Sequence, residues 1–212
     1  ELRAFSYFPN FKKQICQNAF SQYLRYGYVP EPLSIFKKTY KLEPGYIIKF
    51  DKKNKILKKD YWDSVKSFVN AKKNKFKGTF EDAKEKVKRH IDYSIKNRLV
   101  SDVPLGIFLS GGIDSSNLVL SLHRQNITAN TFSIGFHNNN NNEIDFANKV
   151  AKTLKTKHSY KYINNKDCID NIQSIVNAYD EPFSDPSQIP TYMLCKFVKK
   201  KNNRCYLWGG SR

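Results

Sequence analysis

Apolar residues recur at every fourth position along the segment that precedes residue 100. Those that share this spacing are Ala83, Val87, Ile91, Ile95 and Leu99. Such a repeat places side chains along one face of a helix. Thr79 and Asp82, at the start of the segment, are residue types that form a capping box. The pattern therefore predicts an amphipathic scaffold helix that begins after Thr79 and leads the chain to a first strand.

Short apolar runs alternate with helix-like segments from residue 104 onward, as is typical of a doubly wound parallel sheet. The expected strands are 104–109, 131–136, 158–163 and 205–207. The expected helices begin near residue 113 and cover 143–154 and 167–179. Residues 138–142 are all asparagine, and we interpret them as a surface loop. The sequence thus predicts the α/β fold class.

The first part of the chain mixes helical and extended patterns. Residues 18–26 have helical spacing, and Gly27 with the prolines that follow ends the run. The turn residues 43–45, Glu-Pro-Gly, lead into 46–51, which is rich in β-branched and aromatic residues and therefore predicts a strand. Residues 64–80 are rich in Lys and Asn with weak patterning, so we expect a linker there.

The candidate chemistry lies in residues 110–116, Ser-Gly-Gly-Ile-Asp-Ser-Ser, between the first strand and its helix. Two glycines allow an oxyanion to approach the backbone closely, and a helix N-terminus adds N–H donors and partial positive charge. Three serines add hydroxyl donors. We interpret the loop as a phosphate cradle. A capped structural turn is the alternative, although a cap requires only one such residue.

Asp114 stands inside this loop, and the Gly-Lys-Ser/Thr sequence of a Walker loop is missing. An acid beside phosphate groups usually indicates a bridging metal ion. Mg²⁺ fits best, because proteins hold it through one or two carboxylates together with phosphate oxygens.

The chain carries a net charge of +18, and most of the excess precedes the loop. Lysine runs at 52–59 and 72–75 lie among aromatic residues, which is one signature of single-strand nucleic-acid binding. The runs are irregular, however, and coincide with expected turns. A solvated surface is therefore the favoured interpretation, and we expect no nucleic-acid partner.

No apolar run approaches the length of a membrane span, and the first twenty residues show no export signal. We therefore expect a cytoplasmic protein without a membrane partner; because the chain begins at Glu1, an upstream segment is left open. The four cysteines form no Cys-x-x-Cys pair and do not cluster with histidines at metal-binding spacing. Reduced, mostly buried thiols are the expected state.

Several segments resemble a known family. Residues 110–116 resemble the pyrophosphate-binding loop of the ATP pyrophosphatases. Residues 98–106, Arg-Leu-Val-Ser-Asp-Val-Pro-Leu-Gly, resemble the lead-in to that loop in glutamine-hydrolysing asparagine synthetases. Residues 179–192 are similar to an Asp-Glu-Pro-Phe segment of the same family. The first part of the chain resembles the closing segment of the family's glutaminase domain, at residues 23–30, 35–37, 41–46 and 61–62.

The resemblance implies a parallel sheet of the adenine-nucleotide alpha-hydrolase (PP-loop) type, preceded by the α+β tail of an Ntn-type glutaminase domain. It divides the chain into a glutaminase tail at 1–63, a linker at 64–80 and the first part of an ATP-binding synthetase domain at 81–212. The implied reaction converts aspartate to asparagine through β-aspartyl-AMP, with release of AMP and pyrophosphate and with ammonia derived from glutamine. ATP and Mg²⁺ are implied, and a homodimer of the complete enzyme is left open.

The resemblance also assigns roles to individual residues. ATP and pyrophosphate binding falls to Ser110, Gly111, Gly112, Asp114, Ser115 and Ser116. Asp114 would also hold Mg²⁺. Phe108 and Ile134 would flank adenine, with ordinary core packing as the alternative. The acidic loop would line a pocket with three carboxylates, those of Asp180, Glu181 and Asp185, with a solvated turn as the alternative. No catalytic residue is assigned.

The chain departs from the family at both ends. The family's glutaminase nucleophile is an N-terminal cysteine, whereas this chain starts at Glu1 and Cys16 lies in a different context. The family continues from 205–207 into a Ser-Gly-acid-Gly-x-Asp-Glu loop, whereas Trp208 follows here. We therefore expect a fragment that is inactive alone. The alternatives are an amidotransferase acting on a sugar acid of a surface polysaccharide, a non-catalytic ATP-binding remnant and an RNA-modifying enzyme with the same loop.

Overall fold

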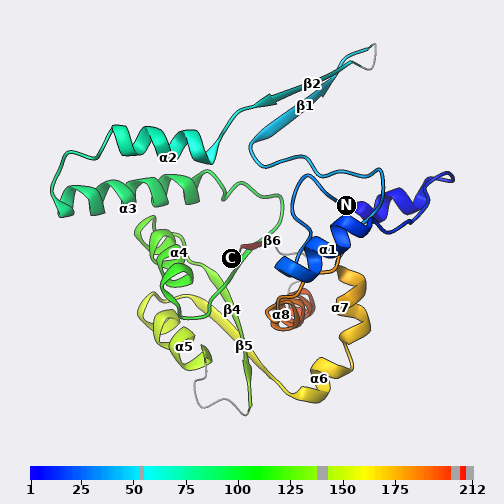
Figure 1. The fold of residues 1–212 in the computed structure, drawn as a ribbon. Coiled ribbons are helices and arrows are strands. Elements are labelled where there is room, and N and C mark those ends of the chain that lie inside the picture. The colour runs from blue at the N-terminus through cyan, green and yellow to red at the C-terminus, as the bar shows by residue number, and fades with distance from the viewer. Residues whose placement is uncertain (53–54, 138–142, 202–205, 209–212) are drawn as a thin grey trace. The chain divides into compact units, whose positions relative to one another are not determined.

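The chain folds into two compact units (Figure 1). The computed structural model describes residues 1–52, 55–137, 143–201 and 206–208. Unit 1 comprises Glu1–Lys77 and Val176–Asp185, and unit 2 comprises Gly78–Ile175 and Pro186–Arg212. Among the described residues, no helix is both long and apolar enough to cross a membrane.

Unit 1 begins with helical structure packed on a small core. Its elements are the 3-10 helix η1 (Leu2–Tyr7), α1 (Gln17–Tyr26), β1 (Tyr46–Phe50), β2 (Ile56–Asp60) and α2 (Ser64–Lys73). Ala19 of α1 packs with Val29 and Ile35 in a buried cluster. Gly27 ends α1 in the left-handed conformation, with φ of 77°, and its N–H donates to the carbonyl of Tyr23 at 2.8 Å. The helix predicted at 18–26 is thereby confirmed.

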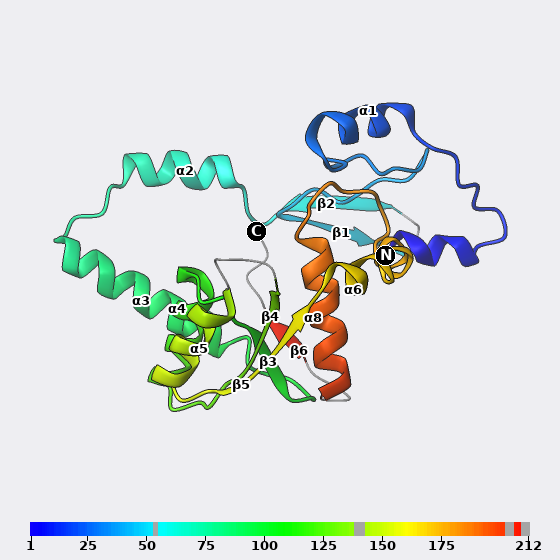
Figure 2. The same cartoon turned by 90° about the horizontal axis from the view of Figure 1, so that it is seen from below.

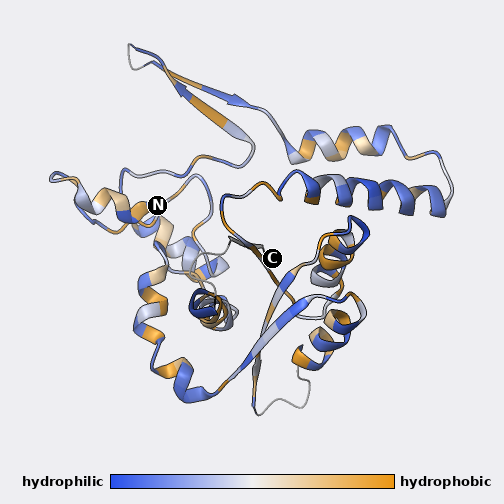
Figure 3. Cartoon of the chain, turned by 180° about the vertical axis from the view of Figure 1, so that it is seen from behind, coloured by the Kyte–Doolittle hydropathy of each residue, from blue (hydrophilic) through white to orange (hydrophobic). Residues whose placement is uncertain are grey.

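The strand predicted at 46–51 is β1, which pairs with β2 in an antiparallel hairpin from Tyr46↔Asp60 to Phe50↔Ile56. Figure 3 shows apolar and polar positions on both strands. The segment expected to be a linker, 64–80, contains a helix, α2, that the sequence analysis did not foresee. The Asp63 side chain accepts from the Lys66 N–H at 2.9 Å and caps this helix. A capping acid before an apolar i, i+3, i+4 spacing was the overlooked signal.

Unit 2 is built around a parallel sheet in the order β5-β4-β3-β6. The strands are β3 (Leu105–Phe108), β4 (Asn130–Phe136), β5 (Lys157–Ile163) and β6 (Tyr206–Trp208). This confirms the α/β class with a parallel sheet. Strand order reverses between β3 and β6, and ligands bind outside the carboxyl ends of strands at such switch points. The predicted strand at 205–207 is shifted by one residue, and Cys205 and the loop 138–142 lie outside the described residues.

Helices cover both faces of this sheet (Figures 1 and 2). On one face, α3 (Phe80–Lys96), α4 (Ile113–Arg124) and α5 (Glu143–Thr153) share a buried cluster with Ile107 of β3. On the other face, α8 (Gln188–Lys201) packs its Leu194 and Val198 against Phe132 of β4. β4 is largely buried, and its aromatic and β-branched residues are the types that predict a strand.

The predicted capping box at the start of α3 is confirmed. The Thr79 hydroxyl accepts from the Asp82 N–H at 3.2 Å, and the Asp82 carboxylate accepts from the Thr79 N–H at 2.9 Å. The apolar stripe is less buried than its spacing suggests, since Val87 is 57% exposed and Ile95 is the buried residue within the helix. The stripe thus packs chiefly at its C-terminal end.

The single helix expected at 167–179 is wrong, because the structure has two shorter helices there. These are α6 (Asn165–Ile169) and α7 (Ile172–Ala178). Asn171 separates them, and its side-chain amide donates to the carbonyl of Asp167 at 2.7 Å. Asparagine side chains that bond nearby backbone carbonyls compete with the helical ladder. A continuous apolar spacing therefore did not produce a continuous helix.

His158 is a half-buried histidine on β5. Its Nδ1 lies 2.9 Å from the hydroxyl of Thr131, while Nε2 is buried without a hydrogen-bond partner among the described residues. Burial lowers the pKa of His158, and a hydrogen bond with the backbone of Thr131 acts more weakly in the opposite direction. The folded state therefore favours the neutral imidazole.

Acidification below the ordinary histidine pKa of about 6.5 should consequently destabilise the fold. Stability from this site is complete above pH 6.5 and is lost as the pH falls toward the lower pKa of the folded state. We expect the melting temperature to fall by a few degrees between pH 7.5 and 5.5. His158→Gln should reduce this fall, whereas substitution of the exposed His90 by Gln should not. Equal acid sensitivity in both variants would contradict the assignment.

Candidate functional site

The end of β3 is held against β4 by two hydrogen bonds. Leu109 is only 1% exposed, and its N–H donates to the carbonyl of Phe132 at 2.9 Å. The buried hydroxyl of Ser133 donates to the carbonyl of Leu109. The candidate loop therefore starts from a fixed point. Sequence reasoning missed Ser133, although hydroxyl residues at alternate positions of an apolar strand were a usable signal.

Ser110 and Ser115 are brought together across the turn. Their hydroxyl oxygens lie 3.0 Å apart, and the Ser115 hydroxyl also accepts from the Ser110 N–H at 3.3 Å. The Gly112 N–H donates to the Ser110 hydroxyl at 3.3 Å, and the Ser115 hydroxyl lies 3.2 Å from the Gly112 carbonyl. These bonds close the turn into a compact ring of polar groups.

Gly111 is required by packing as well as by backbone conformation. Its φ is +79°, which L side chains rarely adopt. A Cβ here would lie 2.5 Å from Cβ of Phe146 and 2.6 Å from the carbonyl carbon of the same residue in α5. The backbone of the turn therefore passes directly against α5, and only glycine permits this approach.

Gly112 has a different environment. It is the N-cap of α4, with φ of −70°, and no side chain caps the helix. A Cβ here would meet the Ser110 hydroxyl at 3.3 Å and no other atom within 4 Å among the described residues. The first turn of α4 thus presents N–H groups and a positive dipole end beside open space, an arrangement that accepts anions.

The Ser116 hydroxyl is buried in the same turn and has no hydrogen-bond partner among the described residues. Its natural intrahelical acceptor, the carbonyl of Gly112, already receives the N–H of Ser116 at 3.0 Å and the hydroxyl of Ser115. Buried hydroxyl groups are nearly always paired in folded proteins. An unpaired one at an uncapped helix start is consistent with a ligand oxygen as the missing partner.

Asp114 lies in the first turn of α4 with an exposed side chain. Within the part of the chain that the structure describes, its carboxylate forms no ion pair or hydrogen bond, and no group of three or more metal-binding side chains exists. A single free carboxylate beside a phosphate cradle suits an ion that takes most of its ligands from phosphate oxygens and water. Mg²⁺ is such an ion.

Phe108 and Ile134 lie on the face of the sheet that α8 covers. Both are partly buried and pack against the cluster formed by Phe132, Leu194 and Val198. Phe108 pairs with Phe132 in the β3–β4 register, and Ile134 follows two positions later on the same face of β4. The two residues are therefore neighbours near the carboxyl ends of their strands, and each retains some exposed surface.

The acidic loop is occupied by contacts within unit 1. Both oxygens of the Glu181 carboxylate are engaged, one by the N–H of Ile35 at 2.7 Å and one by Lys41 Nζ at 2.6 Å. Asp180 lies 3.7 Å from Nε of Arg3. Asp185 is exposed and belongs to the same unit, whereas the turn after β3 belongs to unit 2. Sequence reasoning did not foresee the partners of Glu181.

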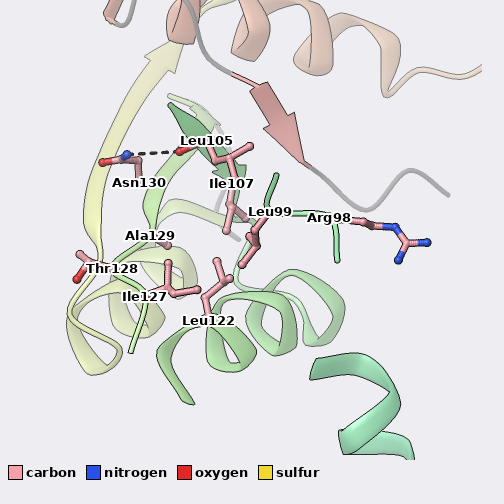
Figure 4. A pocket seen from close by; sticks show the side chains of 10 residues that line it. Arg98, Leu99, Leu105, Ile107, Leu122, Ile127, Thr128, Ala129 and Asn130 are labelled. Atoms are coloured by element: carbon pink, nitrogen blue, oxygen red, sulfur yellow. Dashed lines mark hydrogen bonds between the residues drawn. The ribbon is translucent and has the colours of Figure 1, made fainter. Parts of the chain in front are cut away.

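Other candidate chemistry is weaker. Burial raises the pKa of the Cys195 thiol, which keeps it protonated and poorly nucleophilic. A cavity of about 320 Å³ lies at the amino-terminal ends of β3 and β4, whereas the turn follows the carboxyl end of β3 (Figure 4). Its lining is mostly apolar, with Leu105, Leu122 and Ile127 pointing inward, while Arg98 points away. This cavity does not belong to the phosphate cradle.

A parallel sheet with a glycine-rich turn leading into an uncapped helix defines the class of α/β proteins that receive anionic ligands at the carboxyl end of a central strand. Comparison with known proteins specifies the family. The family model described as asparagine synthase matches residues 86–211. The chain belongs to the asparagine synthase family.

Two relatives illustrate the match. A protein of Methanocaldococcus jannaschii, named as a putative glutamine-hydrolyzing asparagine synthetase, is 34% identical over 196 residues, covering 90% of this chain and 36% of the relative. Asparagine synthetase 1 of Bacillus subtilis, also named as glutamine-hydrolyzing, is 32% identical over 187 residues, covering 88% of this chain and 28% of the relative. The chain thus spans about a third of the length of these relatives.

Among solved structures, an NH3-dependent NAD synthetase from Campylobacter jejuni is similar to part of the chain. The identity is 18%, the match covers 64% of this chain and 58% of the other, and the TM-score is 0.38.

The two glycines of the turn should respond differently to alanine. Gly111→Ala combines a left-handed backbone with overlap against α5, so we expect the free energy of unfolding to fall by at least about 2 kcal/mol. Gly112→Ala should cost under about 1 kcal/mol, because its one close neighbour is a rotatable hydroxyl. Urea unfolding of both variants measures the difference. Equal losses would show that Gly111 is not constrained by α5.

Proposed function

We propose that this chain forms part of an ATP-dependent enzyme that converts aspartate to asparagine with nitrogen taken from glutamine. Residues 1–63 are proposed as the tail of its glutaminase domain and residues 81–212 as the first part of its ATP-binding domain. The matched family and the names of the relatives support this reaction. The observation that carries it is the uncapped start of α4 with a buried Ser116 hydroxyl that has no hydrogen-bond partner among the described residues.

The proposed reaction has two steps. An oxygen of the aspartate β-carboxylate attacks the α-phosphorus of ATP, and the bond to the bridging oxygen of the β-phosphate breaks, so that β-aspartyl-AMP forms and pyrophosphate leaves. Ammonia then attacks the β-carbonyl carbon, the bond to the AMP oxygen breaks, and the nitrogen loses a proton. Both steps expel a phosphate leaving group, which is why a fixed anion cradle is the central requirement.

The residues of the turn hold the departing pyrophosphate. The hydroxyls of Ser110 and Ser115, which already face each other, and the backbone at Gly112 donate hydrogen bonds to its oxygens. Ser116 supplies the buried hydroxyl for which the described part of the chain offers no partner. Gly111 contributes by letting the turn reach its place against α5. The backbone of the turn is fixed before the reaction, so these donors only exchange the hydrogen bonds that they make to one another for bonds to the growing negative charge.

Asp114 is the residue that would hold Mg²⁺ beside the pyrophosphate. When bound, this ion neutralises the charge of the leaving group. The exposed carboxylate at the start of α4 is positioned to share such an ion with phosphate oxygens, and its own negative charge would otherwise repel the nucleotide.

Phe108 and Ile134 flank the adenine ring. Their partly exposed surfaces lie on the α8 face near the carboxyl ends of β3 and β4, where a base can stack on apolar side chains.

Aspartate-dependent exchange of labelled pyrophosphate into ATP tests the first step. We expect exchange by the protein produced from its complete gene, and a loss of at least about tenfold in Ser110→Ala, which removes a leaving-group donor. Replacing aspartate with glutamate or with a uronic acid measures acceptor choice. Exchange that depends on a uronic acid and not on aspartate would refute the proposed substrate.

Asp114→Asn should weaken binding of ATP in the presence of Mg²⁺ by roughly tenfold or more, since a metal-holding carboxylate is lost. Binding of metal-free ATP should be unchanged or improved, because a negative charge beside the phosphates is removed. Calorimetric titration with and without Mg²⁺ gives both values. Equal losses in the two conditions would show that Asp114 acts on the helix start and not through a metal.

A further inference from the structure

The loop between α7 and α8 links the two units through the chain itself. Gly78–Ile175 belong to unit 2, Val176–Asp185 belong to unit 1, and the chain returns to unit 2 at Pro186. The short stretch Val176–Asp185 is therefore a part of unit 1 that lies between two segments of unit 2 in the sequence.

Glu181 is the principal anchor of this loop. Its Oε1 accepts the N–H of Ile35 at 2.7 Å, and its Oε2 pairs with Lys41 Nζ at 2.6 Å. Lys41 Nζ also donates to the carbonyl of Val29 at 2.5 Å. The side chains of Glu181 and Lys41 are only 16% and 27% exposed. A charge pair that is largely withdrawn from water and completed by backbone groups holds a defined geometry, unlike an exposed pair.

Further contacts fasten the rest of the loop. The N–H of Ser184 donates to the carbonyl of Gly27 at 2.6 Å, and a Cβ on Gly27 would lie 3.3 Å from Cβ of Ser184. At the other end, Arg3 contacts the carboxylate of Asp180 and the carbonyl of Asn177. The loop is thus attached to residues 1–41 at Asp180, Glu181 and Ser184.

The C-terminal end of the loop leads directly into α8, which begins at Gln188. Buried side chains of α8, Leu194 and Val198, pack against the cluster that includes Phe108 and Ile134, the proposed neighbours of adenine. A shift of the loop would move the start of α8, because only a few residues separate them. α8 in turn supports the proposed adenine-binding residues. The Glu181–Lys41 pair is the polar contact best placed to prevent that displacement.

We propose that Glu181 and Lys41 are a positioning pair that couples the glutamine-hydrolysing half of the enzyme to its ATP-dependent half, and that Glu181 does not bind substrate. This inference rests on the proposed function. Ammonia released from glutamine must reach the acyl adenylate before it escapes into water, so glutamine-dependent synthesis requires the two halves to be held together. Ammonia supplied from solution reaches the acyl adenylate without that requirement.

The test compares nitrogen sources, with the protein produced from its complete gene. Asparagine formation is measured with saturating glutamine and, separately, with saturating ammonium chloride. Lys41→Met should lower glutamine-supported kcat at least about fivefold, the lower end of typical coupling between sites, and change ammonia-supported kcat less than about twofold. Glu181→Gln should lower the ratio of the two activities in the same direction. Lys41→Arg, which keeps the charge, should retain most of the ratio.

Lys58→Met is the matched control. It removes an ion pair with Glu43 in the same unit, where the side chains are 38% and 33% exposed, and that pair does not involve the loop. The ratio of activities should stay unchanged. Melting temperatures of all variants identify any that fail to fold, and the Lys41→Met and Lys41→Arg pair decides the outcome if Glu181→Gln does not fold.

Several results would overturn the inference. Equal losses with both nitrogen sources, accompanied by a higher KM for ATP or aspartate, would place Glu181 in a substrate pocket. An unchanged ratio in Lys41→Met, or a wild-type protein that uses ammonia but not glutamine, would remove the coupling while leaving the synthetase reaction in place. A wild-type protein that forms asparagine from neither source would refute the proposed function itself.

Discussion

The close passage of the turn after β3 against the backbone of α5 is the constraint on which the candidate site depends. Gly111 is the residue that permits it, because any Cβ would overlap Phe146. This contact fixes where the turn ends and hence where α4 begins. The hydroxyls of Ser110 and Ser115, the uncapped N–H groups and Asp114 then take their positions from the helix start. A glycine that serves packing thereby determines where the candidate site lies.

The neighbouring glycine illustrates a second physical role for the same residue type. Gly112 has an ordinary negative φ, and among the described residues only the Ser110 hydroxyl lies within 4 Å of the position of its missing side chain. Its value lies in the open space that it leaves beside the N–H groups of α4. From the sequence alone the two glycines are equivalent, since both give the backbone of the turn more conformational freedom. Only the packing of α5, over thirty positions away along the chain, distinguishes them. Gly111 is needed for this packing, whereas Gly112 is proposed to leave room for a ligand.

Much of unit 2 could be predicted because its signals are local. The apolar run of β4, the capping box at Thr79 and the Ser-Gly-Gly turn each depend on residues within a few positions of one another. The predictions failed where a side chain competes with the backbone, as Asn171 does between α6 and α7, and where a capping acid was overlooked, as at Asp63. They were silent about Ser133, whose contact with the end of β3 is made between neighbouring strands.

Lysines illustrate why residue type does not reveal role. Lys66, Lys84 and Lys88 form exposed ion pairs with nearby carboxylates, at separations of three to six residues along the chain. Such pairs contribute little, because water screens them and long side chains lose entropy on pairing. Lys41 belongs to the same lysine-rich half of the chain, yet its partner is 140 positions away, and both side chains are largely withdrawn from solvent. The pairing engages one carboxylate of the acidic loop with residues of unit 1. An acid assigned to a site by motif alone therefore needs its partners known before it is given a chemical role.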